Sequence, residues 1–322
     1  MTQIIAEFCQ NHNGSTDLLA RMVEAAGKAG ATHAKIQTIF ADTLTYRPQF
    51  EEGLIIGGEI KSIRRPYDAE YRRLKALEIS QEDTLKFVNI CHQNGLVPMT
   101  TCFARRHSKD IAQAGFKTVK VASYDCASFA MLRDLGSLFE EIVVSTGATF
   151  DDEIVQAASI LEGKSFAFLH CVTLYPTPLE QMHLRRMEWL RNLAPRVGFS
   201  DHSLVSRDSL VASKAALALG ADVIERHFTI LGPAESRDGL VSITPQQLAE
   251  LSAFAALDLR ERVQRMDAEY PNWEVMLGQR QRRLSDQELL NRDYYRGRFA
   301  SPRLESQQGT RMIFNWEETP IP

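Results

Sequence analysis

Eight short apolar runs recur through the first 229 residues, and most are followed by an amphipathic segment that ends at a glycine. The runs are residues 4–9, 33–38, 97–103, 118–123, 141–146, 166–171, 196–200 and 223–229. Glycine permits the left-handed C-cap that turns a helix into the next strand, so each pair indicates a strand–helix unit. Eight such units predict an α/β fold, a (β/α)8 TIM barrel, with its active site at the carboxyl ends of the strands. A doubly wound open sheet uses the same alternation and is the alternative.

Composition and charge exclude several classes of partner. The 322 residues are 44% hydrophobic and 24% charged, and a net charge of −4 offers no basic field for nucleic acid. The N-terminus lacks the basic start of a signal peptide, and no apolar run approaches the roughly 20 residues of a membrane helix. We therefore expect a cytoplasmic protein without membrane contact. The five cysteines form no CxxC pair and are expected to be small buried residues in a reducing compartment.

Two parts of the chain depart from this rhythm. Residues 39–71 are rich in glycine, proline and charge and are too long for a turn, so we expect a lid or a subunit-contact loop on the catalytic face. After the helical segment 245–263 the composition shifts towards Arg, Gln and Asn, and helical periodicity is poor beyond Leu289. We predict a barrel domain at residues 1–265 and a C-terminal extension at residues 266–322.

Two histidines stand at the ends of neighbouring predicted strands. His202 follows the run 196–200 beside Asp201, and His227 lies in the run 223–229 beside Glu225. A strand–helix–strand unit makes these strands parallel, so both imidazoles should reach the same edge of the sheet. Two imidazoles at one edge, each beside a carboxylate, indicate that the histidines are metal ligands. The alternative is a pair of hydrogen-bonded core histidines.

Two lysines, Lys35 and Lys120, lie inside apolar runs, where an ammonium group is costly to bury without a partner. With the hydroxyls that end the predicted strands, they favour a phosphate or a phosphorylated acid as ligand. The alternative for the lysines is a buried ion pair with Glu7 or Glu225. The hydroxyls of Thr101, Ser123 and Ser145 could instead cap helices. The pair Arg105-Arg106 is expected at a solvated helix start.

Long segments, in this order and spacing, resemble the sialic acid synthase (NeuB) family: AEFCQNHNG, AKIQT, TTCF, VKVAS, VVSTGA, LHCVTLYPTP, GFSDHS, GADVIERHFT and RDGLVS. The resemblance implies a TIM barrel followed by a small antifreeze-like domain, in a domain-swapped homodimer. It implies a transferase that condenses phosphoenolpyruvate with an open-chain acylated amino sugar. The product would be a nonulosonic acid, formed with C–O cleavage and phosphate release for surface glycan biosynthesis.

The same resemblance implies roles for individual residues. His202 and His227 would bind a divalent cation, manganese or magnesium. Phosphoenolpyruvate would be held by Lys35, Thr101, Lys120, Ser123, Ser145, Tyr175 and Ser200. Glu7, Gln37 and Asp238 would face the sugar, with Glu7 as the candidate for proton transfer. Thr173, where the family usually has asparagine, and Glu225 complete the expected substrate site.

The clearest departure from the family lies at the C-terminus, where residues 298–322 resemble only the linker and opening strand of the antifreeze-like domain. The arginine that grips the N-acyl group in relatives has no equivalent, and Arg237 or a residue of 291–298 could replace it. The acceptor therefore stays open: an acylated hexosamine, or a neutral or phosphorylated aldose that gives a KDN- or KDO-like product. A non-catalytic barrel that binds phosphoenolpyruvate or a sugar acid, and a two-histidine metal hydrolase, are the remaining alternatives.

Overall fold

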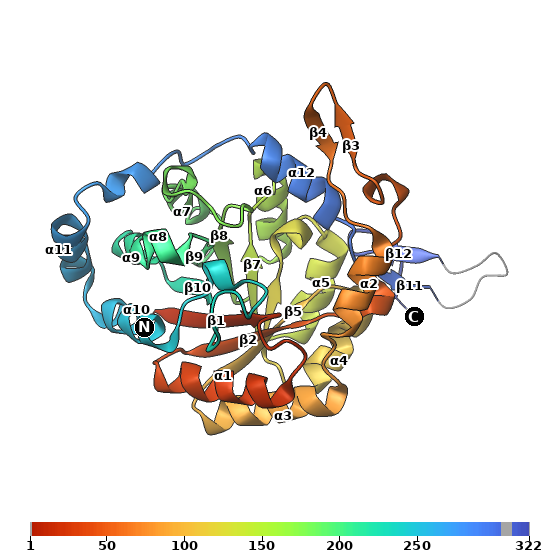
Figure 1. Ribbon diagram of the computed structural model, residues 1–322, viewed down its shortest axis with the longest axis horizontal. Coiled ribbons are helices and arrows are strands. Elements are labelled where there is room, and N and C mark those ends of the chain that lie inside the picture. The colour runs from red at the N-terminus through yellow and green to blue at the C-terminus, as the bar shows by residue number, and fades with distance from the viewer. Residues whose placement is uncertain (1, 304–310, 322) are drawn as a thin grey trace.

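The computed structural model describes residues 2–303 and 311–321 and has at its centre a closed barrel of eight parallel strands (Figure 1). The strands are β1 (Gln3–Cys9), β2 (His33–Thr38), β5 (Val97–Cys102), β6 (Thr118–Val121), β7 (Glu141–Ser145), β8 (Phe166–His170), β9 (Arg196–Asp201) and β10 (Val223–His227). They pair in the order β1-β10-β9-β8-β7-β6-β5-β2, and β2 closes the ring on β1. The predicted TIM barrel is confirmed, with every strand bounded within two residues of its expected limits.

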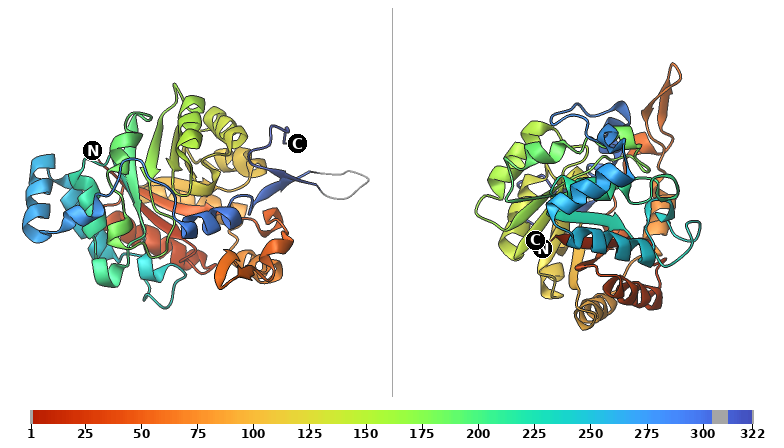
Figure 2. Two further views of the ribbon diagram at one scale, coloured as in Figure 1. Left: turned by 90° about the horizontal axis from the view of Figure 1, so that it is seen from above. Right: turned by 90° about the vertical axis from the view of Figure 1, so that its left-hand side faces the viewer.

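Helices surround this barrel and connect its strands (Figure 2). They are α1 (Thr16–Lys28), α2 (Tyr67–Lys75), α3 (Gln81–Gln93), α4 (Ser108–Gln113), α5 (Phe129–Leu138), α6 (Asp151–Ile160), α7 (Arg186–Leu190), α8 (Val205–Asp208), α9 (Val211–Ala218), α10 (Pro245–Ala256), α11 (Leu259–Glu269) and α12 (Asp286–Tyr295). The connection between β9 and β10 carries two helices, α8 and α9, because Ser209 between them adopts a left-handed conformation with φ 48°. The segment 245–263 also divides, because Asp258 caps a new helix by accepting from the Glu261 amide.

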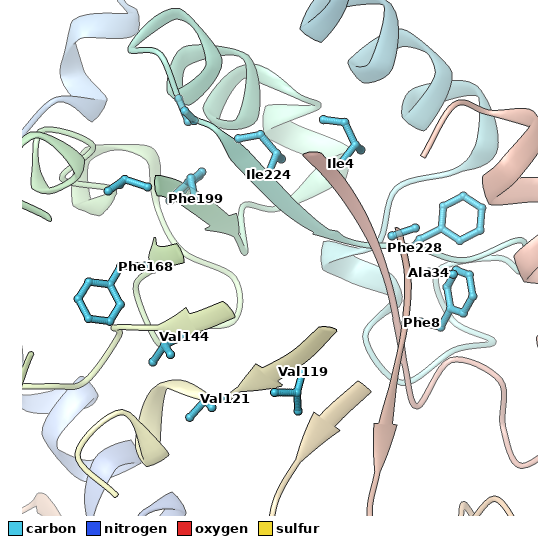
Figure 3. Close-up of a cluster of buried hydrophobic side chains, with 14 of the residues drawn as sticks. Ile4, Phe8, Ala34, Val119, Val121, Val144, Phe168, Phe199, Ile224 and Phe228 are labelled. Carbon is cyan, nitrogen blue, oxygen red and sulfur yellow. The ribbon is translucent and has the colours of Figure 1, made fainter. Parts of the chain in front are cut away.

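Apolar side chains form two layers around the strands. The larger layer lies between the barrel and its helices, and Figure 3 shows part of it, with Phe8 and Phe228 close together at 5.7 Å between ring centroids. The smaller cluster fills the barrel interior and consists of Ile5, Met99, Val143, Ala167, Leu169 and Val223. Because side chains alternate along a strand, the next inward positions after Ile5 and Met99 are Glu7 and Thr101. The apolar plug thus leaves the carboxyl ends of the strands to polar residues.

The long connection after β2 and the C-terminal segment cover the same end of the barrel. The connection carries the hairpin β3 (Leu54–Ile56) and β4 (Glu59–Ser62), and the C-terminal segment forms the hairpin β11 (Ala300–Pro302) and β12 (Met312–Phe314) (Figure 1). The Thr45 amide donates to the Arg298 carbonyl at 2.9 Å, which ties the two segments together. Helix α12 continues six residues beyond Leu289, where the sequence indicated poor periodicity. Residues 304–310 of the predicted extension lie outside the described residues.

Candidate active site

A cavity of about 920 Å³ opens at the carboxyl ends of the strands. It is lined by every residue that the sequence singled out for metal or substrate, namely Glu7, Lys35, Gln37, Thr101, Lys120, Ser123, Ser145, Thr173, Tyr175, Ser200, His202, Glu225, His227 and Asp238. These residues come from seven strands, from the segments that follow some of them, and from the segment after β8, so the closed barrel brings distant sequence positions into one site. Asp201 does not join them, because its carboxylate turns outward to Arg226 and Ser213.

One side of the cavity holds Lys35, whose side chain is only 2% exposed. Its ammonium group forms an ion pair with Glu7 and donates to the Thr101 hydroxyl at 3.0 Å. The other Glu7 oxygen accepts from the Cys9 amide. Burial lowers the pKa of Lys35 to about 7, with Glu225 acting against the shift. The charge of this lysine therefore depends on the carboxylates that surround it.

The second lysine, Lys120, stands beside Ser145 and Glu225. Its ammonium group donates to the Ser145 hydroxyl at 2.7 Å and lies 3.6 Å from a Glu225 oxygen, which also accepts from Ser200 at 3.1 Å. Burial raises the pKa of Glu225, but Lys120 and Lys35 overcome it and bring the pKa to about 2. Both ion pairs weighed as alternatives in the sequence are therefore present, and both face the cavity.

The two histidines share this cavity. The rings of His202 and His227 have centroids 5.6 Å apart, and the Tyr175 ring lies 4.1 Å from the first and 6.1 Å from the second. Burial lowers the pKa of His202 to about 3 and also lowers that of His227, so both rings are neutral. His202 donates from Nδ1 to the Val172 carbonyl at 3.1 Å, so its lone pair is on Nε2, which lies 3.5 Å from the Ser200 hydroxyl.

The donor set fits a divalent cation. Nδ1 of His227 is buried without a hydrogen-bond partner among the described residues and lies 3.6 Å from a carboxylate oxygen of Asp238. Ligand atoms of Cys9, His227 and Asp238 lie within 4.8 Å of one another. Neutral imidazoles with nearby anionic donors are ordinary ligands of such ions. The sequence predicted the histidines but treated Cys9 as a buried hydrophobic residue.

Arginines line the mouth of the cavity, and two of them, Arg237 and Arg298, belong to the set that the sequence offered as a replacement for the acyl-binding arginine of relatives. Arg73, on α2, forms an ion pair with Glu70 at 2.8 Å, and Arg298, after α12, pairs with the same carboxylate. Arg65 and Arg237 complete the cationic part of the lining. Burial lowers the pKa of Arg298 to about 9, and the positive charges of Arg47 and Arg65 add to the shift. One carboxylate thus serves two guanidinium groups, which leaves an excess of positive charge at the mouth.

Comparisons with known proteins identify relatives in sequence and in structure. N,N'-diacetyllegionaminic acid synthase of Legionella pneumophila is 30% identical over 257 residues, 77% of this chain and 69% of that protein. Pseudaminic acid synthase of Campylobacter jejuni is 30% identical over 244 residues, 74% of this chain and 68% of that protein. The crystal structure of the spore coat polysaccharide biosynthesis protein SpsE of Bacillus subtilis aligns with a TM-score of 0.72 at 22% identity. The alignment covers 97% of this chain and 84% of that one and shows a common fold.

The fold and the cavity define a TIM-barrel enzyme whose cavity opens at the carboxyl ends of its strands. A model of the NeuB family matches residues 22–257, and the chain belongs to that family of sialic and nonulosonic acid synthases. It is a phosphoenolpyruvate-dependent nonulosonic acid synthase of the transferase class. In the part of the chain that the structure describes, no helix is both long and apolar enough to cross a membrane.

Proposed function

We propose that the chain condenses phosphoenolpyruvate with an open-chain N-acylated amino sugar to form a sialic-type acid and free phosphate. The observation that carries the proposal is the convergence of two lysines and two histidines in one cavity: Lys35, Lys120, His202 and His227. A metal hydrolase would not need the two buried ammonium groups. A binding protein would not need neutral imidazoles beside an anion site.

Phosphoenolpyruvate is assigned to the side of the cavity that contains the lysines. Lys120 and Lys35 supply the positive charge, and the hydroxyls that already contact them supply directional donors. The remaining hydroxyls assigned to this substrate are Ser123, Thr173, Tyr175 and Ser200. Ser123 contacts the Cys171 sulfur at 3.0 Å. No hydrogen-bond partner of the Thr173 hydroxyl is found among the described residues, so this hydroxyl is available to a ligand.

The cation is assigned to His202 and His227, and family membership suggests manganese or magnesium. When bound there, it would polarise the aldehyde oxygen of the sugar as a Lewis acid. The fit rests on the unpartnered Nδ1 of His227 and on the tautomer that Val172 imposes on His202. We also propose that the protein is a homodimer, which a mass measurement by light scattering would test.

The reaction then requires one carbon–carbon bond and one carbon–oxygen cleavage. Carbon 3 of the enol phosphate attacks the aldehyde carbon, and the aldehyde oxygen takes a proton to become a hydroxyl. Glu7, held between Lys35 and the Cys9 amide, is placed to move that proton. Water adds to carbon 2, and the bond from carbon 2 to the phosphate oxygen breaks with its electron pair leaving on phosphate. Lys35 and Lys120 stabilise the negative charge that develops on the leaving group.

A phosphorylated aldose is the second candidate acceptor, and the arginines at the cavity mouth favour it. Arg73 and Arg298 share Glu70, and Arg65 lies beside them with no carboxylate partner among the described residues. An anionic group at the far end of the sugar would satisfy this excess charge. Gln37 and Asp238 are assigned to the hydroxyl groups of the acceptor in either case.

Phosphate release from phosphoenolpyruvate tests both candidates. We would supply a divalent cation and compare an N-acylated hexosamine with a neutral aldose and a phosphorylated aldose. Release that requires the acylated sugar supports the leading proposal, and release only with a phosphorylated aldose supports the second. Tight binding of phosphoenolpyruvate without release from any sugar would contradict both.

The variant Arg65→Ala separates the two acceptors further. If the second candidate is correct, it should raise KM for the phosphorylated acceptor about tenfold and leave KM for phosphoenolpyruvate unchanged. The matched control is Arg64→Ala, since Arg64 is the neighbouring exposed arginine and does not line the cavity.

A further inference from the structure

Cys9 occupies an unusual position at the end of β1. The pairing of β1 with β2 shifts register between Glu7 and Cys9, and Cys9 adopts a left-handed conformation with φ 46°. Such a backbone is disfavoured for residues other than glycine, and strain of this kind gathers at functional sites. The shift brings the Cys9 side chain to the lining of the cavity.

The other cysteines show what an ordinary buried cysteine looks like in this fold. Cys91, Cys102 and Cys126 belong to the main apolar cluster, whereas Cys9 belongs to none of the apolar clusters of the described residues. Cys171 also lines the cavity, but its sulfur contacts the Ser123 hydroxyl at 3.0 Å. Cys9 is therefore distinguished by its neighbours as well as by its backbone.

Those neighbours are metal-ligating groups. One ligand atom from each of Cys9, His227 and Asp238 lies within 4.8 Å of the others. The separation of 3.6 Å between Nδ1 of His227 and the Asp238 oxygen is too long for a hydrogen bond. That nitrogen is also buried without a partner in the described chain, so one metal-ligating atom of the group is left without a hydrogen bond.

Hydrogen bonds from the Asn11 side chain hold the loop that carries Asp238. The Asn11 side chain accepts from the Asp238 amide at 3.0 Å and donates to the Ser242 hydroxyl at 2.9 Å, which in turn donates to the Asp238 carbonyl at 2.8 Å. Support of this kind behind a ligand holds it in a metal site. Cys9 ends β1 and Asn11 follows two residues later, so one short stretch of chain positions a ligand and the residue that supports another ligand.

We propose that the Cys9 sulfur and the Asp238 carboxylate join His202 and His227 as cation ligands, and that the thiolate makes the site prefer zinc, ferrous or cobaltous ion to magnesium or manganese. The inference rests on the two-histidine cation site of the proposed function and changes its composition. A thiolate is a soft donor that hard magnesium and manganese ions bind weakly, while later first-row ions bind it strongly. A metal-bound cysteine gives up its proton on binding.

Cobaltous ion is the probe, because its bonds to thiolate sulfur produce a near-ultraviolet charge-transfer absorption that nitrogen and oxygen ligands do not give. We expect this band in the full chain after removal of metal with a chelator and loading with one equivalent of cobalt. Cys9→Ser should abolish the band, while the visible cobalt absorption remains. Cys171→Ser, a change in the same cavity away from the histidines, should leave the band intact.

Competition titrations supply the second readout. Cys9→Ser should lower zinc affinity by at least about tenfold and change manganese affinity much less. A cobalt-bound protein without the charge-transfer band, or a band that survives in Cys9→Ser, would overturn the inference and leave the two-histidine site standing. Failure of the wild-type chain to bind cobalt would overturn the inference together with the cation site of the proposed function.

Discussion

Replacing Lys35 with methionine separates the structural role of its ion pair with Glu7 from its role in catalysis. Both side chains are 2% exposed, so Lys35→Met leaves the Glu7 carboxylate buried with the Cys9 amide as its remaining donor. Removing one partner of a buried ion pair costs about 3–5 kcal/mol in the free energy of unfolding. We expect a loss of that size.

The double variant Lys35→Met, Glu7→Gln removes the unpaired charge. The new amide oxygen can still accept from Cys9, and neutral replacement of a buried ion pair is often close to neutral in stability. We expect the free energy of unfolding to return to within about 1.5 kcal/mol of the wild type, the typical net value of one hydrogen bond. Catalysis should not return, because phosphoenolpyruvate has lost a charged hydrogen bond and the double variant also lacks the Glu7 carboxylate assigned to proton transfer. The loss of the charged hydrogen bond lowers kcat/KM about a hundredfold in the single variant, and the loss in the double variant should be at least as large.

Urea unfolding followed by tryptophan fluorescence measures the first quantity, and phosphate release measures the second. Lys28→Met serves as the control, since Lys28 forms an exposed pair with Glu24 and should leave both readouts unchanged. A double variant as unstable as the single one would refute the account of the ion pair. Recovery of phosphoenolpyruvate turnover in the double variant would refute the role of Lys35 at the substrate.

Two further predictions concern the cation and pH. His202→Ala should abolish both cation binding in a calorimetric titration and phosphate release. The control is His92→Ala, on the exposed face of α3, which should preserve both. A fully active His202→Ala enzyme would contradict the cation site. Burial raises the pKa of Asp125 from 3.8 to about 6, so its contribution to stability is full below pH 3.8 and is lost as pH rises through 6. The wild type should therefore lose about 2.5 kcal/mol of stability relative to Asp125→Asn between pH 4 and pH 7, from urea midpoints at each pH. A difference between the two proteins that does not vary with pH would contradict it.

The barrel and most of its site were predictable because both depend on local patterns. Strand and helix periods give the element order, and the carboxyl ends of parallel strands meet at one rim. Lys35 and Lys120 were therefore placed correctly from their positions in apolar runs. The sequence left open whether these lysines bind substrate or form ion pairs. Each one contacts a carboxylate and also lines the cavity, so the two roles are compatible.

What the sequence did not indicate depends on backbone conformation and on contacts between distant segments. Cys9 reaches the cavity through a register shift and a left-handed residue, neither of which leaves a periodic signal. Arg73 and Arg298 lie 225 positions apart (298 − 73) and meet only because the long connection and the C-terminal segment pack together. Arg105 was expected in solvent, but it is buried and pairs with Asp134. Its guanidinium group also donates to the Glu317 carbonyl of the C-terminal segment at 2.7 Å.

Charge balance inside the cavity connects the substrate to the cation. The two lysines are matched by Glu7 and Glu225, and both histidines are neutral, so the protein groups of the interior carry little surplus positive charge for a substrate with several negative charges. A divalent ion at His202 and His227 would supply that surplus. Phosphoenolpyruvate should therefore bind more tightly when the ion is present, and linkage requires the ion to bind more tightly in return. Titration of each ligand with and without the other measures this coupling, and independent binding of the two would show that the lysines alone neutralise the substrate.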